Sequence, residues 1–167
     1  VAPEDEADRV LAVRLQDEGV AHGADVEAGA LPLRDAVDAP ILLHDADRML
    51  WDVVWPGESP DQALAPGETL LAGGHALVVL HTPGHSPGCC SFHDTSSGAV
   101  FSGDTLFPGG PGNTTFEGGD FSTIIGSIDR RLFAPLAPET IVMPGHGLDT
   151  TIGAEQPKLD EWVDRGW

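Results

Sequence analysis

Three short segments each place a potential metal ligand on a loop shaped by glycine and proline. His85 stands in a Thr-Pro-Gly-His segment, Asp104 in a Gly-Asp-Thr-Leu-Phe segment and His146 in a Pro-Gly-His-Gly segment. Each segment follows an apolar run that is typical of a β-strand. Glycine and proline let the backbone turn sharply, so the three side chains can point into one shared cleft.

Two imidazoles and a carboxylate on such loops predict a divalent metal site. These groups suit a borderline-soft divalent ion. His81 and His85 are four residues apart, as in the helical His-Glu-x-x-His metalloproteases, but Pro83 and Gly84 between them exclude a helix. The ligands are therefore expected on loops at the ends of strands.

The elements that must position these loops are strands in the middle of the chain and helices at its flanks. Strands are predicted over residues 41–43, 69–72, 76–81, 90–93, 99–102 and 140–143, with tight turns at Gly73-Gly74 and at 94–98. Helices are predicted over 5–19, from a cap at Asp45 or Asp47 to Val54, over 121–133 after Asp120 or Ser122, and over 154–164. We therefore predict a single α/β (α+β) domain over residues 1–167, a four-layer αββα sandwich with the ligand loops at one edge.

The three ligand segments, taken in this order, resemble the metallo-β-lactamase-fold hydrolases, and most closely their glyoxalase II-like branch. The resemblance covers about residues 20 to 165, and the runs Ala39-Pro-Ile-Leu-Leu-His and Thr151-Ile-Gly-Ala-Glu also match that branch. It implies that His85 binds a first metal ion, that Asp104 bridges two ions and that His146 binds the second ion.

The family's richest ligand segment, His-x-His-x-Asp-His, is not intact in this chain. Where it is expected, only His22 and Asp25 match it. One alignment keeps both residues in the segment with two histidines removed. The other places His22 at the final histidine of the segment, with Asp17 and Gly19 where earlier histidines belong. Both alignments leave the first metal site short of ligands.

The beginning of the chain also departs from the family pattern. Residues 5–19 carry acidic residues in the first turn of a predicted helix and a glycine at its end. The apolar strand expected between Gly19 and His22 is absent. Because the loss of a central strand would disrupt a sheet, we expect a longer protein with intact N-terminal strands and His-rich segment rather than a degenerate relative.

The resemblance implies a metal-dependent hydrolase of thioesters or esters, acting through a metal-bound hydroxide. Up to two divalent ions, which the resemblance implies to be zinc or else iron or manganese, would lower the pKa of a shared water and polarise the carbonyl of the substrate. Asp104 and Asp25 are the expected catalytic residues, because Asp104 would hold the ions together and Asp25 would join His146 at the second ion. His22 completes the expected metal ligands, and the thiol carrier stays open.

Two other hypotheses stay open at this point. Hydrolysis with a single ion and an open water position needs only three protein ligands. In the other hypothesis the ligands hold one structural ion or none, and the chain is a non-catalytic binding or scaffold protein that has kept the family fold.

The acidic composition excludes several classes of partner. The chain has 27 aspartates and glutamates against 8 lysines and arginines, which gives a net charge of −19. Such a surface repels nucleic acids and anionic membranes, so we predict a small-molecule substrate instead. No apolar run approaches a membrane span and no signal-peptide pattern is present, so a cytoplasmic location is expected. The family resemblance adds a homodimer as an expectation.

The spread of the acidic residues, together with Lys158 as the single lysine, indicates adaptation to high salt. Unscreened like charges repel one another, and the Debye length grows to about 30 Å at about 0.01 M salt. We therefore expect the melting temperature to fall steeply when the protein is diluted from molar salt to that concentration. Thermal melts across this range check the prediction, and full stability at the lowest ionic strength would contradict it.

Overall fold

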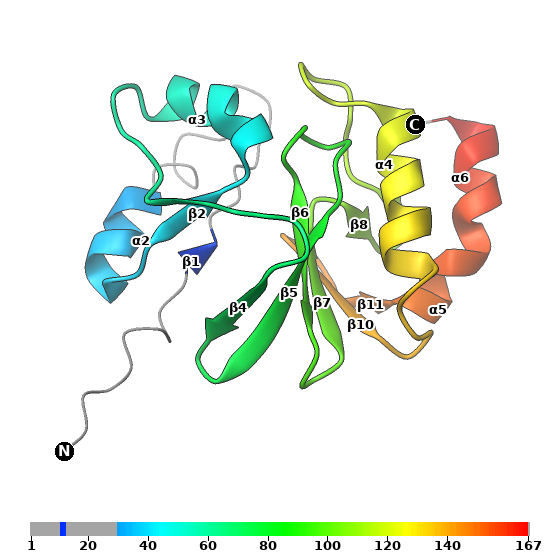
Figure 1. The fold of residues 1–167 in the computed structure, drawn as a ribbon. Helices are drawn as coiled ribbons and strands as arrows, with labels where there is room; N and C mark the ends of the chain where they lie inside the picture. The colour runs from blue at the N-terminus through cyan, green and yellow to red at the C-terminus, as the bar shows by residue number, and fades with distance from the viewer. Residues whose placement is uncertain (1–10, 13–29, 167) are drawn as a thin grey trace.

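The computed structural model describes Leu11–Ala12 and residues 30–166. Its first two layers come from the N-terminal part of the chain (Figure 1). The small sheet has the parallel strand order β1-β2-β3, with β1 (Leu11–Ala12), β2 (Ile41–Leu43) and β3 (Gln62–Ala63). Helices α2 (Ala30–Val37) and α3 (Arg48–Val54) pack on it through a core of Ala30, Ile41, Leu43 and Trp51. This core fixes the outer face of the small sheet.

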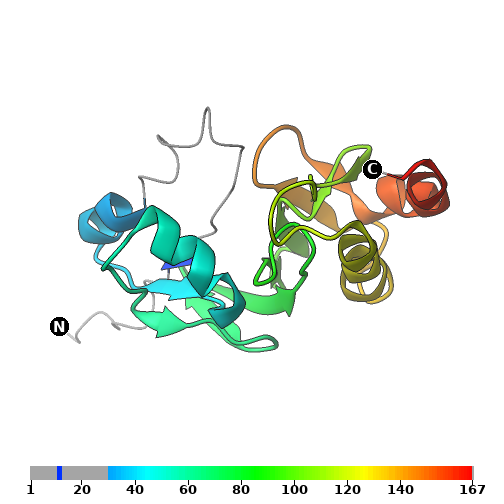
Figure 2. The ribbon, with the colours of Figure 1, turned by 90° about the horizontal axis from the view of Figure 1, so that it is seen from above.

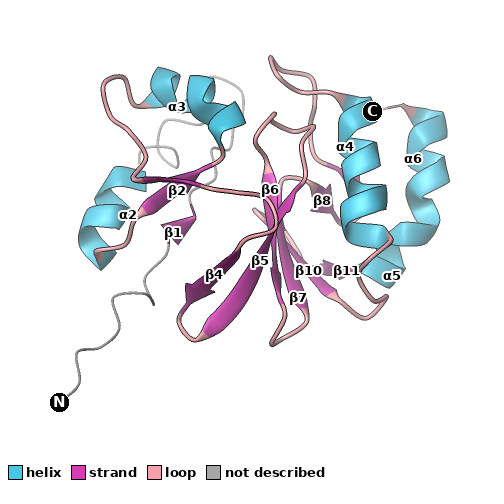
Figure 3. Ribbon diagram, in the orientation of Figure 1, coloured by secondary structure: helices cyan, strands magenta, loops and turns pink. Residues whose placement is uncertain are grey.

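The other two layers are a six-stranded sheet and the C-terminal helices. The strand order of this sheet is β11-β10-β7-β6-β5-β4. Its strands are β4 (Thr69–Ala72), β5 (His75–His81), β6 (Cys90–Asp94), β7 (Ala99–Gly103), β10 (Ile141–Pro144) and β11 (Thr150–Thr151). The helices are α4 (Phe121–Ser127), which continues as a π-helix over Ile128–Phe133, then α5 (Ile152–Glu155) and α6 (Leu159–Arg165). Figures 2 and 3 show the helices on one side of the sheet and the small sheet on the other.

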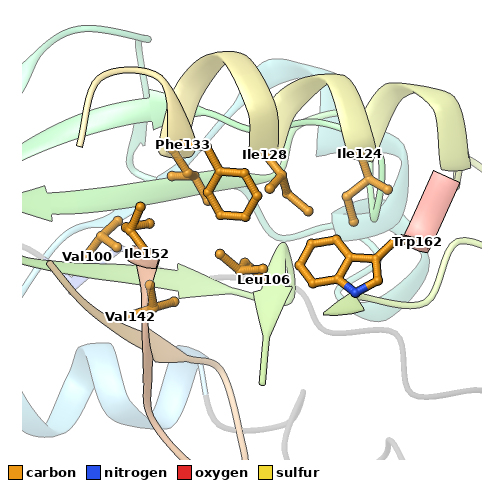
Figure 4. Packing of buried hydrophobic residues seen from close by; sticks show 9 residues of the cluster. Val100, Leu106, Ile124, Ile128, Phe133, Val142, Ile152 and Trp162 are labelled. Atoms are coloured by element: carbon orange, nitrogen blue, oxygen red, sulfur yellow. The ribbon is translucent and has the colours of Figure 1, made fainter. Parts of the chain in front are cut away.

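Side chains of the large sheet alternate between two cores, although Leu71, Phe101 and Ile141 are exposed. Val100 and Val142 are fully buried against the C-terminal helices, in a cluster that includes Ile124, Ile128 and Trp162 (Figure 4). On the opposite face, Leu70 and Val79 pack against Leu42 and Leu64 from the N-terminal part. Alternation of apolar residues on a strand with two covered faces is the pattern of a central sheet in a sandwich. The predicted αββα architecture is confirmed.

Three details of the sequence prediction are wrong. Leu11–Ala12 belongs to a strand, not to the helix predicted over 5–19, because it pairs in parallel with the buried strand β2. Helix α2 was not predicted. The closing helix is not continuous, because α5 and α6 are separated by a 3₁₀ turn at Gln156–Lys158 that contains Pro157. None of the helices in the described part of the chain is long and apolar enough to cross a membrane.

Glu155 anchors the C-terminal helices to the loop after the ligand strand β7. Its buried carboxylate accepts hydrogen bonds from the Thr150 hydroxyl at 2.7 Å and from the Gly109 N–H at 2.9 Å, and it pairs with Lys158 at 3.0 Å. Burial raises the pKa of this carboxyl, but these three donors outweigh burial and hold the pKa below its ordinary value. The carboxylate form therefore stabilises the fold.

Because the pKa of Glu155 is lower in the folded protein, its contribution is present above the ordinary pKa of 4.5 and is lost as the pH falls through the lower folded value. We expect Glu155→Gln to lower the free energy of unfolding at pH 7 by about 1–3 kcal/mol, with a smaller loss at pH 3. Urea unfolding at both pH values measures this. Glu161→Gln, in an exposed pair with Arg165, is the control and should change little. Equal losses at both pH values would contradict the prediction.

Candidate metal centre

The candidate ligands come together because three strands of the large sheet point the same way. β10 runs parallel to β7, and β5 is antiparallel to β6, which is antiparallel to β7. The C-terminal ends of β5, β7 and β10 therefore meet at one edge of the sheet. The loops that follow these strands carry His85, Asp104 and His146, respectively.

Asp104 lies between the two histidines, with one carboxylate oxygen towards each. Its Oδ2 is 3.5 Å from Nε2 of His85, and its Oδ1 is 4.0 Å from Nε2 of His146. Two ligand atoms on one tetrahedral ion, each bonded at about 2.0–2.2 Å, lie about 3.3–3.6 Å apart. The His85 distance matches this value and the His146 distance is slightly longer. Nε2 of His85 and Oδ2 of Asp104 are therefore spaced to share one divalent transition ion, and Oδ1 of Asp104 faces His146.

The candidate ligands lie in two pairs, His85 with Asp104 and His146 with Asp104, rather than in one compact set. Among Leu11–Ala12 and residues 30–166, no three His, Cys, Asp or Glu side chains are spaced to hold a common ion. A carboxylate that faces one histidine with each oxygen accords with two neighbouring ion positions, each served by a different histidine. His22 and Asp25, the other predicted ligands, lie outside the described residues.

His85 is held in the tautomer that a metal ligand needs. Its Nδ1–H donates a hydrogen bond to the carbonyl oxygen of Asn113 at 2.9 Å, since a carbonyl can only accept. In the neutral imidazole, a proton on Nδ1 leaves the lone pair on Nε2, the atom that faces Asp104. The Phe116 ring packs edge-on against the buried imidazole, with ring centroids 4.9 Å apart. Such a partner on the second ring nitrogen orients a histidine ligand.

The glycine-rich segment 108–119 thus contributes to the site. The strand just before it, β8 (Leu106–Phe107), pairs in a hairpin with β9 (Gly110–Pro111), which lies near the beginning of the segment. Asn113 and Phe116 then contact His85. These two contacts indicate that the segment is a loop of the site and not a plain connection.

His146 occupies the open side of the site. Its side chain is 54% exposed, whereas the His85 side chain is 5% exposed. The His146 imidazole packs against the Phe107 ring at a tilt of 41°, with centroids 4.6 Å apart. The two histidines therefore present different surroundings, one dry and fixed and the other accessible to solvent.

The loop that carries His85 is tied down by several neighbours. Nε2–H of His81 donates to the carbonyl of Pro87 at 2.9 Å, and the hydroxyl of Ser127 donates to the carbonyl of Pro83 at 2.7 Å. The His81 ring also stacks on His44 at 4.3 Å. Burial, and then the neighbouring His81, lower the pKa of His44, which favours the neutral form of His44. His81 therefore orients the ligand loop.

Sequence reasoning missed a contact between this loop and the small-sheet half of the molecule. Asp47 was predicted as a possible cap of α3, but its side chain makes no capping hydrogen bond. The carboxylate instead bonds to Ser86 and Gly88, which lie 39 and 41 residues further along the chain. No local pattern signals a contact over that separation.

Comparison with known proteins identifies the family of the chain. Residues 27–146 match the model of the metallo-β-lactamase superfamily. Hydroxyacylglutathione hydrolase GloC of Haemophilus influenzae is 44% identical over 90 residues, which are 54% of this chain and 42% of that protein. The BLEG-1 B3 metallo-β-lactamase has a TM-score of 0.67 at 34% identity, over 80% of this chain and 68% of that one. TTHA1623, solved in a di-iron-bound form, has a TM-score of 0.66 at 37% identity, over 77% and 67%.

The match to the family model covers most of the chain and includes all three loops described above. The chain belongs to the metallo-β-lactamase superfamily. It spans 42%, 64% and 66% of the length of three curated relatives that it matches.

Proposed function

We propose that this protein is a metal-dependent hydrolase of thioesters, with hydroxyacyl thioesters of the glutathione type as its substrate class. The observation that carries the proposal is the carboxylate of Asp104 between His85 and His146, at 3.5 and 4.0 Å. The likeness to a hydroxyacylglutathione hydrolase supports the substrate class. The di-iron form of TTHA1623 supports a site for two ions, and we propose zinc, with iron or manganese as alternatives.

Divalent ions bound at this site would lower the pKa of a water molecule and polarise the carbonyl of the substrate. Asp104 would compensate positive charge with one oxygen towards each histidine. His85, whose Nδ1–H is held by Asn113, offers Nε2 in a fixed direction and from a site that excludes water. His146 lies on the exposed side, where substrate would approach. We propose His22 and Asp25 as further ligands, with Asp25 beside His146.

The proposal also covers the type of substrate, the location of the protein and its oligomeric state. A small molecule, rather than nucleic acid or a membrane, suits a chain with a net charge of −19. We further propose a cytoplasmic enzyme that forms a homodimer. Sedimentation in high salt would check the oligomeric state.

Two measurements test the proposed function. Elemental analysis of protein purified in high salt without chelator should give about two ions per chain, as expected for a two-metal site. A lactoyl-glutathione thioester should then release thiol, and a chelator should stop this release until metal is restored. The matched oxygen ester and a β-lactam serve as comparison substrates, because one structural relative is a B3 metallo-β-lactamase.

The outcomes separate the competing hypotheses. Protein without bound metal would overturn the hydrolase proposal and favour a scaffold that kept the fold. One bound ion with hydrolysis would point to the single-ion mechanism. Turnover of the β-lactam without turnover of the thioester would overturn the substrate class alone.

A further inference from the structure

A buried carboxylate of the small-sheet half faces the loop that carries His85. Asp47 is the last residue of a 3₁₀ turn, Asp45–Asp47, between β2 and α3, and it is 5% exposed. Burial of a carboxylate is costly unless hydrogen bonds replace its water. The bonds of Asp47 come from the ligand loop rather than from its own helix.

The two oxygens of Asp47 hold the loop on both sides of Pro87. Oδ2 accepts a hydrogen bond from the Ser86 hydroxyl at 2.7 Å, and Oδ1 accepts one from the Gly88 N–H at 2.6 Å. Bonds to an ionised acceptor are stronger than neutral ones. Ser86 directly follows His85, so one of the two bonds acts on the residue next to the ligand.

The packing at this contact is close enough to require glycine in the loop. A Cβ atom at position 88 would lie 2.6 Å from Cγ of Asp47 and 2.9 Å from its backbone nitrogen. The approach of the loop to the carboxylate thus depends on the missing side chain of Gly88. Gly88 in the sequence thus matches the short distance between the loop and Asp47 in the structure.

Stability alone does not account for a carboxylate here, because well-packed apolar residues often replace buried charges without loss. Asp47 does something that an apolar residue cannot do, which is to fix the backbone and a hydroxyl of a loop from the opposite half of the sandwich. The carbonyl of Asn113 fixes the imidazole of His85 through a second hydrogen bond, at 2.9 Å. These two anchors determine where Nε2 of His85 lies relative to Asp104.

We propose that Asp47 is a positioning residue, which holds the His85 loop so that Nε2 stands at ligand distance from Asp104 before metal binds. The inference rests on the proposed function, since it concerns the same metal site. It assigns to the small-sheet half a role in metal affinity that acts through Ser86 and Gly88.

The test compares the affinity for Co²⁺ or Zn²⁺ of the purified protein and three variants, by competition with a chromophoric chelator. Asp47→Ala should weaken binding about 10–100-fold, as expected for loss of a group that orients a ligand. Asp47→Asn should stay near wild type, because its amide oxygen can accept from Gly88 and its amide N–H can donate to the Ser86 oxygen. Asp52→Ala, which removes an exposed partner of Arg48, is the control and should change nothing.

Thermal melts with and without metal separate positioning from a purely structural role. Binding to the folded state stabilises a protein in proportion to the logarithm of its affinity. If Asp47 serves only the fold, Asp47→Ala lowers the melting temperature of the metal-free protein but keeps the affinity and the metal-induced shift, which would overturn the inference. If Asp47 positions the loop, the metal-induced shift shrinks.

Ser86→Ala keeps the test decisive even if Asp47→Ala does not fold. It removes one of the two hydrogen bonds, and we expect a several-fold weaker affinity with an unchanged Asp52→Ala control. Affinities equal to wild type in Ser86→Ala and in any folded Asp47→Ala would overturn the inference and leave the proposed function intact. A wild-type protein that binds no metal would overturn the proposed function and this inference with it.

Discussion

Asp104→Asn is expected to abolish hydrolysis and to lower the metal content of the protein. The substitution keeps the size of the side chain but removes its negative charge. In Asp104 one carboxylate oxygen lies 3.5 Å from Nε2 of His85 and the other lies 4.0 Å from Nε2 of His146. Under the proposed function, loss of this ligand also loses the several kcal/mol that a bound metal ion contributes to the reaction, so kcat/KM should fall by about 10³-fold or more. Thiol release from the thioester and metal content per chain measure the two effects.

Asp94→Asn provides a matched control for this substitution. Both aspartates are 3% exposed, but Asp94 ends β6 at the far end of the sheet. Hydrogen bonds from Ser96, then Ser97, hold the pKa of Asp94 below its ordinary range. Asp94→Asn should therefore affect stability but neither metal content nor kcat/KM of the folded protein. Full metal content and wild-type turnover in Asp104→Asn would contradict the proposed role of Asp104 as a metal ligand.

Gly84→Ala is expected to have the largest effect on stability. Gly84 has a φ of +129°, and a Cβ atom there would lie 2.3 Å from the backbone nitrogen of Ile124 in α4. Strain of this kind costs about 1–3 kcal/mol, and forcing atoms into a packed interior costs about 1–3 kcal/mol more. We expect the free energy of unfolding to fall by about 2–6 kcal/mol, as measured by urea unfolding in high salt.

Gly57→Ala separates backbone strain from the steric clash. Gly57 has a φ of +91°, but its Cβ would meet nothing within 4 Å. This control should show the strain without the clash and be clearly less destabilised than Gly84→Ala. Equal losses in the two variants would mean that α4 can move away from the ligand loop, contrary to the close packing described here.

The sequence predicted best where the signals are local. Glycine and proline marked the three ligand loops, and Asp120 does cap α4, since its side chain accepts from the N–H of Thr123. The strands of the large sheet were recognised for the same reason, because apolar runs between turn residues indicate strands. The three ligand loops converge because β5, β7 and β10, the strands that precede them, run in the same direction.

The features that were missed depend on partners far away in the chain. Leu11–Ala12 is a strand because β2 lies beside it, which a helical pattern of residues 5–19 cannot reveal. The π-helix at Ile128–Phe133 has the same apolar pattern as an ordinary helix, so the sequence predicted only a helix. The bond between Asp47 and Ser86 is a property of how two halves of the sandwich meet.

The unequal exposure of His85 and His146 affects how long each bound metal ion would stay on the protein after folding. If two ions bind as proposed, the ion beside the 5% exposed His85 would exchange more slowly than the ion beside the 54% exposed His146. The inner position would keep the metal acquired during folding, while the outer one follows the metal supply of the moment. A population of otherwise identical molecules would then differ in composition according to when each was made.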